Sequence, residues 1–249
     1  MDKLLETCVD SYASAAAAIR GGADRLELCS ALAVGGLTPS PALLKQIREV
    51  SSISVRCLMR PRGGDFLYTR EELRQMAMEI RELKAAGADG FVIGCLTADG
   101  DLDSEAMKPL LEAAEGAGLT LHRCIDVSRN PVQTYRDAAA LGIDTVLTSG
   151  AAGSCMAGME VIRKLITLRD TEHGPEVLIG AGVNAKVIDT FLNHVPGARA
   201  FHMSGKTEIE SAMRFRREGV PMGLPGLDEW HIQQTSEEAV RAAKGILNK

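Results

Sequence analysis

The chain has 249 residues, of which 45% are hydrophobic and 24% are charged, an ordinary composition for a globular protein. Its net charge of −5 argues against a nucleic-acid-binding protein, because such proteins carry a concentrated basic excess. We expect no signal peptide and no membrane span, and six cysteines without a CxxC pair indicate reduced thiols in the cytoplasm.

Short apolar segments at regular intervals predict eight β-strands along the chain. They lie at 4–10, 25–30, 53–60, 90–96, 119–126, 144–150, 176–182 and 199–205. Segments such as PALLKQIREV, with apolar residues three and four positions apart, predict amphipathic helices between them. Several of these helices end at a glycine just before the next strand, at 21–24, 86–89, 141–144 and 196–199, where a left-handed C-cap fits.

Eight strand–helix repeats predict an α/β fold, a single-domain (β/α)8 TIM barrel over residues 1–249. A doubly wound open sheet is the alternative, but it usually has a glycine-rich turn after the first strand. The segment CVDSYAS at that position is not glycine-rich. Residues 206–235 break the repeat, and we predict a weak helix followed by an irregular segment before the closing helix. Long irregular segments are often functional or interfacial, so we expect an oligomer contact there.

The first two predicted strands direct polar side chains into the barrel. Side chains alternate between the two faces of a strand, so Leu26 and Leu28 face the helices while Glu27 and Cys29 point inward. The same alternation turns Glu6 and Cys8 inward. Cys8 and Cys29 therefore have two interpretations, as small buried hydrophobic residues or as a two-thiolate site for a soft ion such as Cu(I).

The ends of the later strands indicate an anion site. The segments LTSG, LIGAGV and HMSGK place small residues where TIM barrels bind phosphate: Ser149, Gly180, Gly182, Ser204 and Gly205. Glycines at tight turns are the simpler explanation. In the segment CLMRPRGGDFLYT, Arg60 and Arg62 have the geometry to bind a carboxylate or phosphate, although an ion pair with Asp65 explains them equally well.

Two histidines and an aspartate complete the set of candidate residues. His122 and Asp126 are four residues apart on a predicted strand and so share a face, and His202 lies on the last strand. Each histidine is either a satisfied core residue or a group for metal binding or acid–base chemistry. An enzyme at this position would use Glu27, Arg60, His122, Asp126 and His202 as its catalytic residues.

The strand-end motifs resemble those of the CutC copper homeostasis family. From about residue 4 to residue 223, the chain carries ETCVDS, GGADRLELCS, GGLTPS, MRPRGGDFLYT, LHRCIDVSRNP, VLTSG, GAGV and MRFRREG in the family's order. The resemblance implies a cytoplasmic homo-oligomer, a homodimer or larger, with Cys8 and Cys29 as proposed Cu(I) ligands. The chain departs from the family in HRCID, which adds Cys124 where HRAFD is usual, and in Met203 and Gly205 after the strand-eight histidine.

Two functions remain open from the sequence. The first is copper homeostasis through Cu(I) binding at the two thiols, which the resemblance favours. The second is a TIM-barrel enzyme acting on a small phosphorylated or carboxylated metabolite, which the arginines favour because a copper carrier has no evident need for them. A barrel that serves mainly as an assembly surface is the weakest reading, since charge is concentrated at one end.

Overall fold

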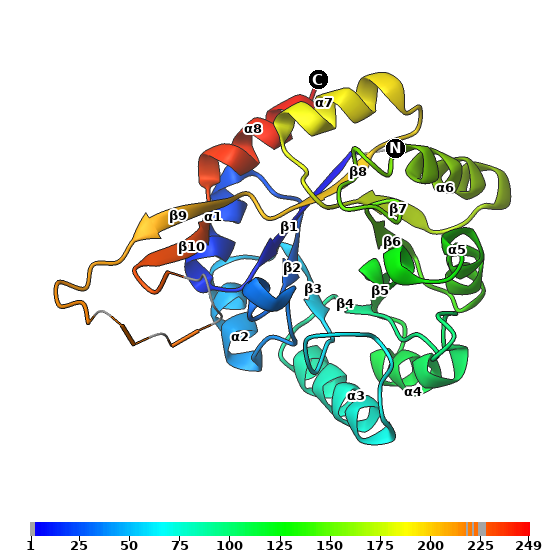
Figure 1. Cartoon of the computed structure of the whole chain (residues 1–249), viewed down its shortest axis with the longest axis horizontal. Coiled ribbons are helices and arrows are strands. Elements are labelled where there is room, and N and C mark those ends of the chain that lie inside the picture. The colour runs from blue at the N-terminus through cyan, green and yellow to red at the C-terminus, as the bar shows by residue number, and fades with distance from the viewer. Residues whose placement is uncertain (1–2, 218, 221, 224–227) are drawn as a thin grey trace.

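The computed structural model describes residues 3–217, 219–220, 222–223 and 228–249. Eight parallel strands close into a barrel in sequence order (Figure 1), which confirms the predicted TIM barrel. The barrel strands are β1 (Leu4–Val9), β2 (Arg25–Leu28), β3 (Ser54–Leu58), β4 (Gly90–Ile93), β5 (Gly118–Leu121), β6 (Thr145–Thr148), β7 (Glu176–Ile179) and β8 (Ala200–Met203).

Helices surround the barrel on its outer face (Figure 1). They are α1 (Tyr12–Gly21), α2 (Pro41–Val50), α3 (Arg70–Ala85), α4 (Ser104–Ala114), α5 (Pro131–Ala140), α6 (Met159–Glu172), α7 (Ala185–His194) and α8 (Glu237–Leu247). Short 3-10 helices follow two strands, η1 (Leu32–Val34) after β2 and η2 (Arg123–Val127) after β5. Most α-helices begin at a polar N-cap, such as Ser11, Ser40 and Asn184, whose side chain accepts a backbone N–H of the first turn.

The predicted glycine exits from the helices are confirmed. Gly22, Gly87, Gly142 and Gly197 have φ values of 90°, 103°, 78° and 84°, in the left-handed region that glycine adopts without steric cost. Three of these glycines come two residues before an aspartate, in the segments GAD, GAD and GID. This spacing places each aspartate at the amino-terminal edge of the barrel.

Each of the three aspartates forms two hydrogen bonds with one residue of the preceding strand. Its carboxylate accepts the backbone N–H of that residue, and its own backbone N–H donates to the carbonyl. The Asp24 carboxylate accepts the Leu5 N–H at 2.7 Å, and the Asp24 N–H donates to the Leu5 carbonyl at 2.9 Å. Asp89 does the same with Val55, at 2.7 Å and 3.0 Å, and Asp144 with Leu119, at 2.6 Å and 3.2 Å. We call these contacts the aspartate clips. They join β1 to β2, β3 to β4 and β5 to β6.

The main apolar core lies between the barrel and the helices. The barrel interior contains two small apolar clusters and a group of buried charged side chains. In one small cluster, Leu4 packs with Leu147, Leu178 and Ala200. Near the carboxyl end, a second small cluster contains Cys8, Cys29, Leu58 and Val92. Buried charged side chains, including Glu6, Arg25 and Glu27, lie on the inward face of β1 and β2. The barrel is therefore polar inside, on the strands that carry the candidate site.

Arg56 crosses the interior from β3. Its Nη1 donates to Thr120 Oγ1 at 2.7 Å and forms an ion pair with Asp144 at 2.7 Å. Glycines on β4 and β5 leave room for this side chain, since a Cβ at Gly118 would lie 2.7 Å from Arg56 Nη2. The arginine therefore fills space that branched apolar residues fill in most TIM barrels.

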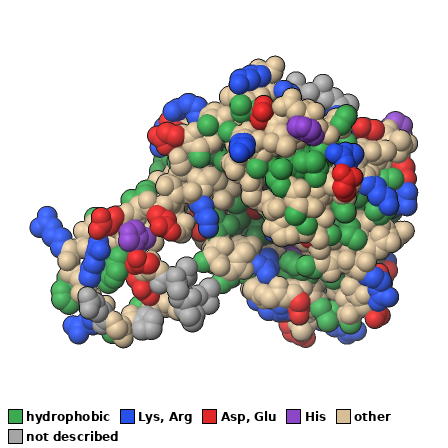
Figure 2. Space-filling model, turned by 45° about the horizontal axis from the view of Figure 1, so that its top comes forward, with side chains coloured by type: hydrophobic (Ala, Val, Ile, Leu, Met, Phe, Trp, Pro, Cys, Tyr) green, Lys and Arg blue, Asp and Glu red, His purple; other side chains and the backbone are tan. Residues whose placement is uncertain are grey.

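Residues 206–235 differ from the prediction. Instead of a weak helix, the structure has strand β9 (Lys206–Glu210), which pairs antiparallel with β10 (His231–Thr235). Ile209 lies opposite Ile232 in this pair. Figures 1 and 2 show the hairpin standing away from the barrel beside α1. Described residues between the strands lack helix or strand, and 218, 221 and 224–227 lie outside the described residues.

Candidate functional site

A cavity of about 430 Å³ opens at the carboxyl ends of the barrel strands, where TIM barrels carry their sites. Leu32, Leu58 and Phe66 give it an apolar part. Its polar lining comes from several strands and the loops that follow them: Cys8, Glu27, Arg60, His122, Arg123, His202 and Ser204.

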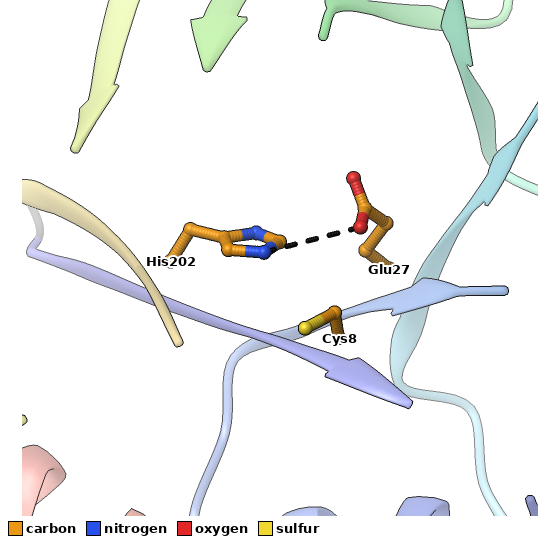
Figure 3. A group of neighbouring side chains, drawn as sticks. All are labelled: Cys8, Glu27 and His202. Carbon is orange, nitrogen blue, oxygen red and sulfur yellow. Dashed lines mark ion pairs between the residues drawn. The ribbon is translucent and has the colours of Figure 1, made fainter. Parts of the chain in front are cut away.

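Three of these side chains form a compact group of potential metal ligands. The Cys8 Sγ, a carboxylate oxygen of Glu27 and a ring nitrogen of His202 all lie within 4.8 Å of one another. Figure 3 shows the three side chains converging from the neighbouring strands β8, β1 and β2. Cys8 is opposite Glu27 in the register of β1 and β2. Strand pairing therefore brings together a sulfur, an oxygen and a nitrogen donor.

A second carboxylate orients His202 from behind. Its Nδ1 lies 2.7 Å from Glu6 Oε1, and the other oxygen of Glu6 accepts from Arg25 Nε at 2.5 Å. Burial alone would raise the pKa of Glu6, but Arg25 and His202 outweigh it and lower that pKa to about 2. The ionised Glu6 holds the Nδ1 proton, so His202 Nε2 faces Glu27 Oε2 at 3.9 Å.

The pKa values of Glu27 and His202, which face each other across this site, are both raised. Burial raises the pKa of Glu27 above its ordinary value, although the charge of His202 opposes this. Burial would lower the pKa of His202, but Cys8, Glu27 and Glu6 outweigh it and raise that pKa well above its ordinary value. The carboxylates and the thiol around His202 therefore favour its protonated form.

Cys29 lies next to this group rather than within it. Its Sγ is 3.5 Å from Glu27 Oε2, and it packs in the same apolar cluster as Cys8. The side chain is fully buried and does not line the cavity. Burial, followed by the charge of Glu27, raises the pKa of the Cys29 thiol well above its ordinary value. The inward direction predicted for both cysteines is correct, and Cys8 alone faces the cavity.

Arg60 lines the cavity from the loop after β3, with 8% of its surface exposed. Its Nη1 donates to the carbonyls of Val34 and Gly36, each at 3.1 Å, and its Nη2 donates to Gly64 at 2.8 Å. The guanidinium also lies over the Phe66 ring, 5.3 Å from the centroid. Arg60 thus fixes the loops after β2 and β3 around the cavity.

His122 follows β5 directly and is the N-cap of η2, where its Nδ1 accepts the Cys124 N–H at 3.2 Å. Burial, and then the charge of Arg60, lowers the pKa of His122 to about 3. His122 is therefore neutral, and its proton resides on Nε2. Gly94 leaves the room for this ring, since a Cβ there would lie 2.6 Å from His122 Cε1.

The sequence predicted that Asp126 and His122 share one face of a strand, and this prediction is wrong. β5 ends at Leu121, and Asp126 belongs to η2. Its carboxylate accepts the Ser149 N–H at 2.9 Å and the Ala151 N–H at 3.0 Å. The Ser149 hydroxyl lies 2.8 Å from the same carboxylate. Ser149 was expected to help bind an anion after β6. In the structure the Asp126 carboxylate already accepts the hydrogen bonds of these amides.

The other predicted anion-binding residues are divided between the cavity and its surroundings. Gly182 and Ser204 line the cavity. Arg62 instead pairs with Glu72 at 2.6 Å and Asp65 at 3.0 Å, the ion pair that was the alternative explanation for it. Gly180 donates its N–H to Thr148, and Gly205 packs against α8, where a Cβ would lie 3.4 Å from Val240.

Comparison with known proteins places the chain in a family. The family profile described as "CutC family" matches residues 3–207. The chain belongs to the CutC family. A CutC family protein of Chromobacterium violaceum is 42% identical over 100% of both chains, and one of Klebsiella pneumoniae is 40% identical over 98% of each.

Solved structures agree with this assignment. A CutC protein of Streptococcus agalactiae, named for copper homeostasis, aligns with a TM-score of 0.76 and 29% identity, over 81% of this chain and 98% of its own. N-(5'-phosphoribosyl)anthranilate isomerase of Pyrococcus furiosus aligns with a TM-score of 0.56 at 14% identity, over 99% and 98%. The latter likeness shows the barrel fold alone.

In this CutC family member, sequence reasoning did not single out three residues that shape the site. Arg25 holds Glu6, Arg56 fills the barrel below the site, and Phe66 contacts both Arg60 and His122. Arg25 shares the inward parity of Glu27, so strand alternation was a usable signal for it. Phe66 acts through a loop contact that no local pattern reveals. No helix in the described ranges has the length and apolar character required to cross a membrane.

Proposed function

We propose that this CutC family member acts in copper homeostasis by binding Cu(I) at the carboxyl end of its barrel. The observation that carries the proposal is the convergence of Cys8, Glu27 and His202 within 4.8 Å at the cavity wall. Thiolates select Cu(I), and imidazole is also a copper ligand. The Streptococcus agalactiae relative named for copper homeostasis adds support.

The surroundings of His202 suit metal binding. Histidine ligands of metals commonly donate their second ring N–H to a carboxylate, which fixes the tautomer and the ring orientation. Glu6 occupies that position, 2.7 Å from His202 Nδ1, and leaves Nε2 directed to Cys8 and Glu27. Cys29 remains a predicted second thiolate ligand, because its Sγ lies 3.5 Å from Glu27 Oε2.

An anaerobic Cu(I) competition titration tests the proposal. We expect stoichiometric binding by the native chain and a loss of at least 100-fold in affinity for Cys8→Ser, because the variant lacks the cavity-facing thiolate. Cys29→Ser reports whether the second thiol contributes. Cys57→Ala is the matched control, since Cys57 is buried on the outer face of β3 in the main core. Weak binding by the native chain, or binding indifferent to Cys8, contradicts the proposal.

A second candidate function is catalysis on a small phosphorylated or carboxylated metabolite. The observation in its favour is that Arg60 and His122 face the same cavity as Glu27 and His202. A panel of such metabolites, assayed for turnover with the native chain and with Glu27→Gln, tests this candidate. Turnover that is lost in the variant supports it, and no turnover across the panel rejects it.

We also propose that the protein resides in the cytoplasm. All six cysteines are free and buried in the structure, a state that suits a reducing compartment. Fractionation of the source cells, with immunodetection of the native chain, tests this placement. Recovery with a membrane or secreted fraction contradicts it.

A further inference from the structure

The Arg60 side chain is a buried cation without an opposite charge. Only 8% of its surface is exposed, and none of the ion pairs between described residues includes it. Three backbone carbonyls accept from its terminal nitrogens, while its Nε has no hydrogen-bond partner among the described residues. A buried charge is normally paired, so this part of the cavity is electrostatically incomplete.

His122 adds an unused donor beside it. Because Nδ1 accepts the Cys124 N–H, the proton of the neutral ring resides on Nε2. That buried nitrogen has no partner within the described ranges either. The Phe66 ring contacts both side chains, 4.7 Å from the His122 centroid and 5.3 Å from Arg60 Cζ. Arg60 and His122 therefore form one continuous wall, which we call the donor wall.

The rest of the cavity favours an anion at this wall. Glu6 is neutralised by Arg25 and His202, and Asp126 by Arg123 and the amides after β6. Glu27 lies next to His202, with 3.9 Å between Oε2 and Nε2. The volume of about 430 Å³ is within the usual range for small-molecule sites. A guanidinium and a neutral N–H donor suit the oxygens of a carboxylate or phosphate.

We propose that the donor wall of Arg60 and His122 binds the carboxylate or phosphate group of a small molecule held in the cavity. This site is separate from the thiol of Cys8, and the inference does not depend on copper binding. The sequence suggested Arg60, Arg62 and Ser149 for an anion. In the structure Arg62 and Ser149 are bound by carboxylates of the chain, whereas Arg60 is paired with none among the described residues.

The test uses the full-length protein after treatment with a chelator, so that copper plays no part. Inorganic phosphate and malonate are the probes, and sodium chloride at equal ionic strength is the reference. Thermal unfolding and isothermal titration calorimetry measure binding. We expect saturable stabilisation by at least one probe, which identifies phosphate or carboxylate as the preferred group.

The variants separate the donor wall from its neighbours. We expect Arg60→Met and His122→Asn each to weaken binding at least tenfold, and Arg62→Met to change it less than twofold. Asparagine remains a good N-cap for η2 but withdraws the Nε2 donor, so His122→Asn decides the matter if Arg60→Met fails to fold. Equal stabilisation by chloride, or binding that survives both substitutions, overturns the inference. A larger loss of probe binding in Arg62→Met than in Arg60→Met also overturns the inference.

Discussion

Glu6 balances the charges inside the barrel. It is fully buried, and its two oxygens bind Arg25 at 2.5 Å and His202 at 2.7 Å. Removing one member of a buried ion pair costs more than the pair contributes, because the partner charge stays behind without compensation. Two cations depend on this single carboxylate, so its loss affects both stability and the orientation of His202.

The pKa of about 2 for Glu6 sets a pH window for this effect. A lowered pKa gives stabilisation that is complete above the ordinary value of 4.5 and is lost as pH falls toward 2. We expect Glu6→Gln to reduce the free energy of unfolding by about 3 kcal/mol at pH 7. The difference from the native chain should narrow between about pH 4.5 and 3 in urea unfolding. A difference that stays constant over this range contradicts the assignment.

Gly94 positions His122 by having no side chain. A Cβ at this position would lie 2.5 Å from Cys124 Sγ and 2.6 Å from His122 Cε1. We expect Gly94→Ala to displace the ring and to lower the free energy of unfolding by about 1–3 kcal/mol, the usual cost of overpacking. Gly153→Ala is the control, since a Cβ at Gly153 would meet nothing within 4 Å. Equal denaturation midpoints for the two variants would show that the ring has room to move.

At the residue scale, the sequence predicted which way a strand side chain points better than it predicted which residue that side chain binds. Strand alternation correctly turned Cys8, Glu27 and Cys29 inward. It offered no means of seeing that Asp126 binds the Ser149 amide, 23 residues away, because that contact exists only after β5 and β6 are paired. Arg62 shows the same limit, since its partner Glu72 is placed by the start of α3.

At the element scale, the regular strand–helix repeat was enough to predict the barrel, whereas the hairpin of β9 and β10 was not predicted. Eight strand predictions agree with β1–β8 to within a few residues, because apolar runs and glycine exits mark both ends of each unit. β9 and β10 are largely exposed and are stabilised by each other. Each strand has five mainly polar residues with a single isoleucine, so local patterns give little signal for the pair.

The aspartate clips make a prediction at this scale. Asp89 accepts the Val55 N–H and pairs with Arg48, so Asp89→Ala removes both interactions at the start of β3. We expect a loss of about 1–3 kcal/mol in the free energy of unfolding. Asp89→Asn, which keeps an acceptor oxygen, should lose less. Asp189→Ala, on the exposed face of α7, is the control, and an equal loss in all three variants contradicts the role of the clip.

At the scale of the whole molecule, the hairpin is the part best placed to meet a second copy of the chain. Apolar side chains are exposed on both of its strands and on the described residues between them: Ile209, Met213, Phe215, Val220, Met222 and Ile232. Figure 2 shows this segment projecting from the barrel. The expected homo-oligomer remains a prediction, and we propose the face of Ile209 and Ile232 as its contact.

Replacing that apolar pair tests the contact. Ile209→Lys combined with Ile232→Glu puts opposite charges at directly paired positions, which preserves the hairpin. We expect light scattering after gel filtration to give a lower mass than for the native chain, with unchanged thermal unfolding of the barrel. Gln233→Lys, opposite Glu208 on the other face, should leave the mass unchanged. A native chain that is already monomeric, or a double variant of unaltered mass, rejects the contact.

The aspartate clips also bear on how the barrel is built during folding. Each clip closes a segment of 19, 34 or 25 residues, so it forms within a single strand–helix–strand unit and needs no distant part of the chain. The entropic cost of closing a loop grows with its length, so each clip costs less to close than the contact between Glu6 and His202, which lie 196 residues apart. We therefore expect the clips to form before the first and last strands of the barrel meet. Early protection of the amide protons of Leu5, Val55 and Leu119 in pulsed hydrogen exchange would report this order.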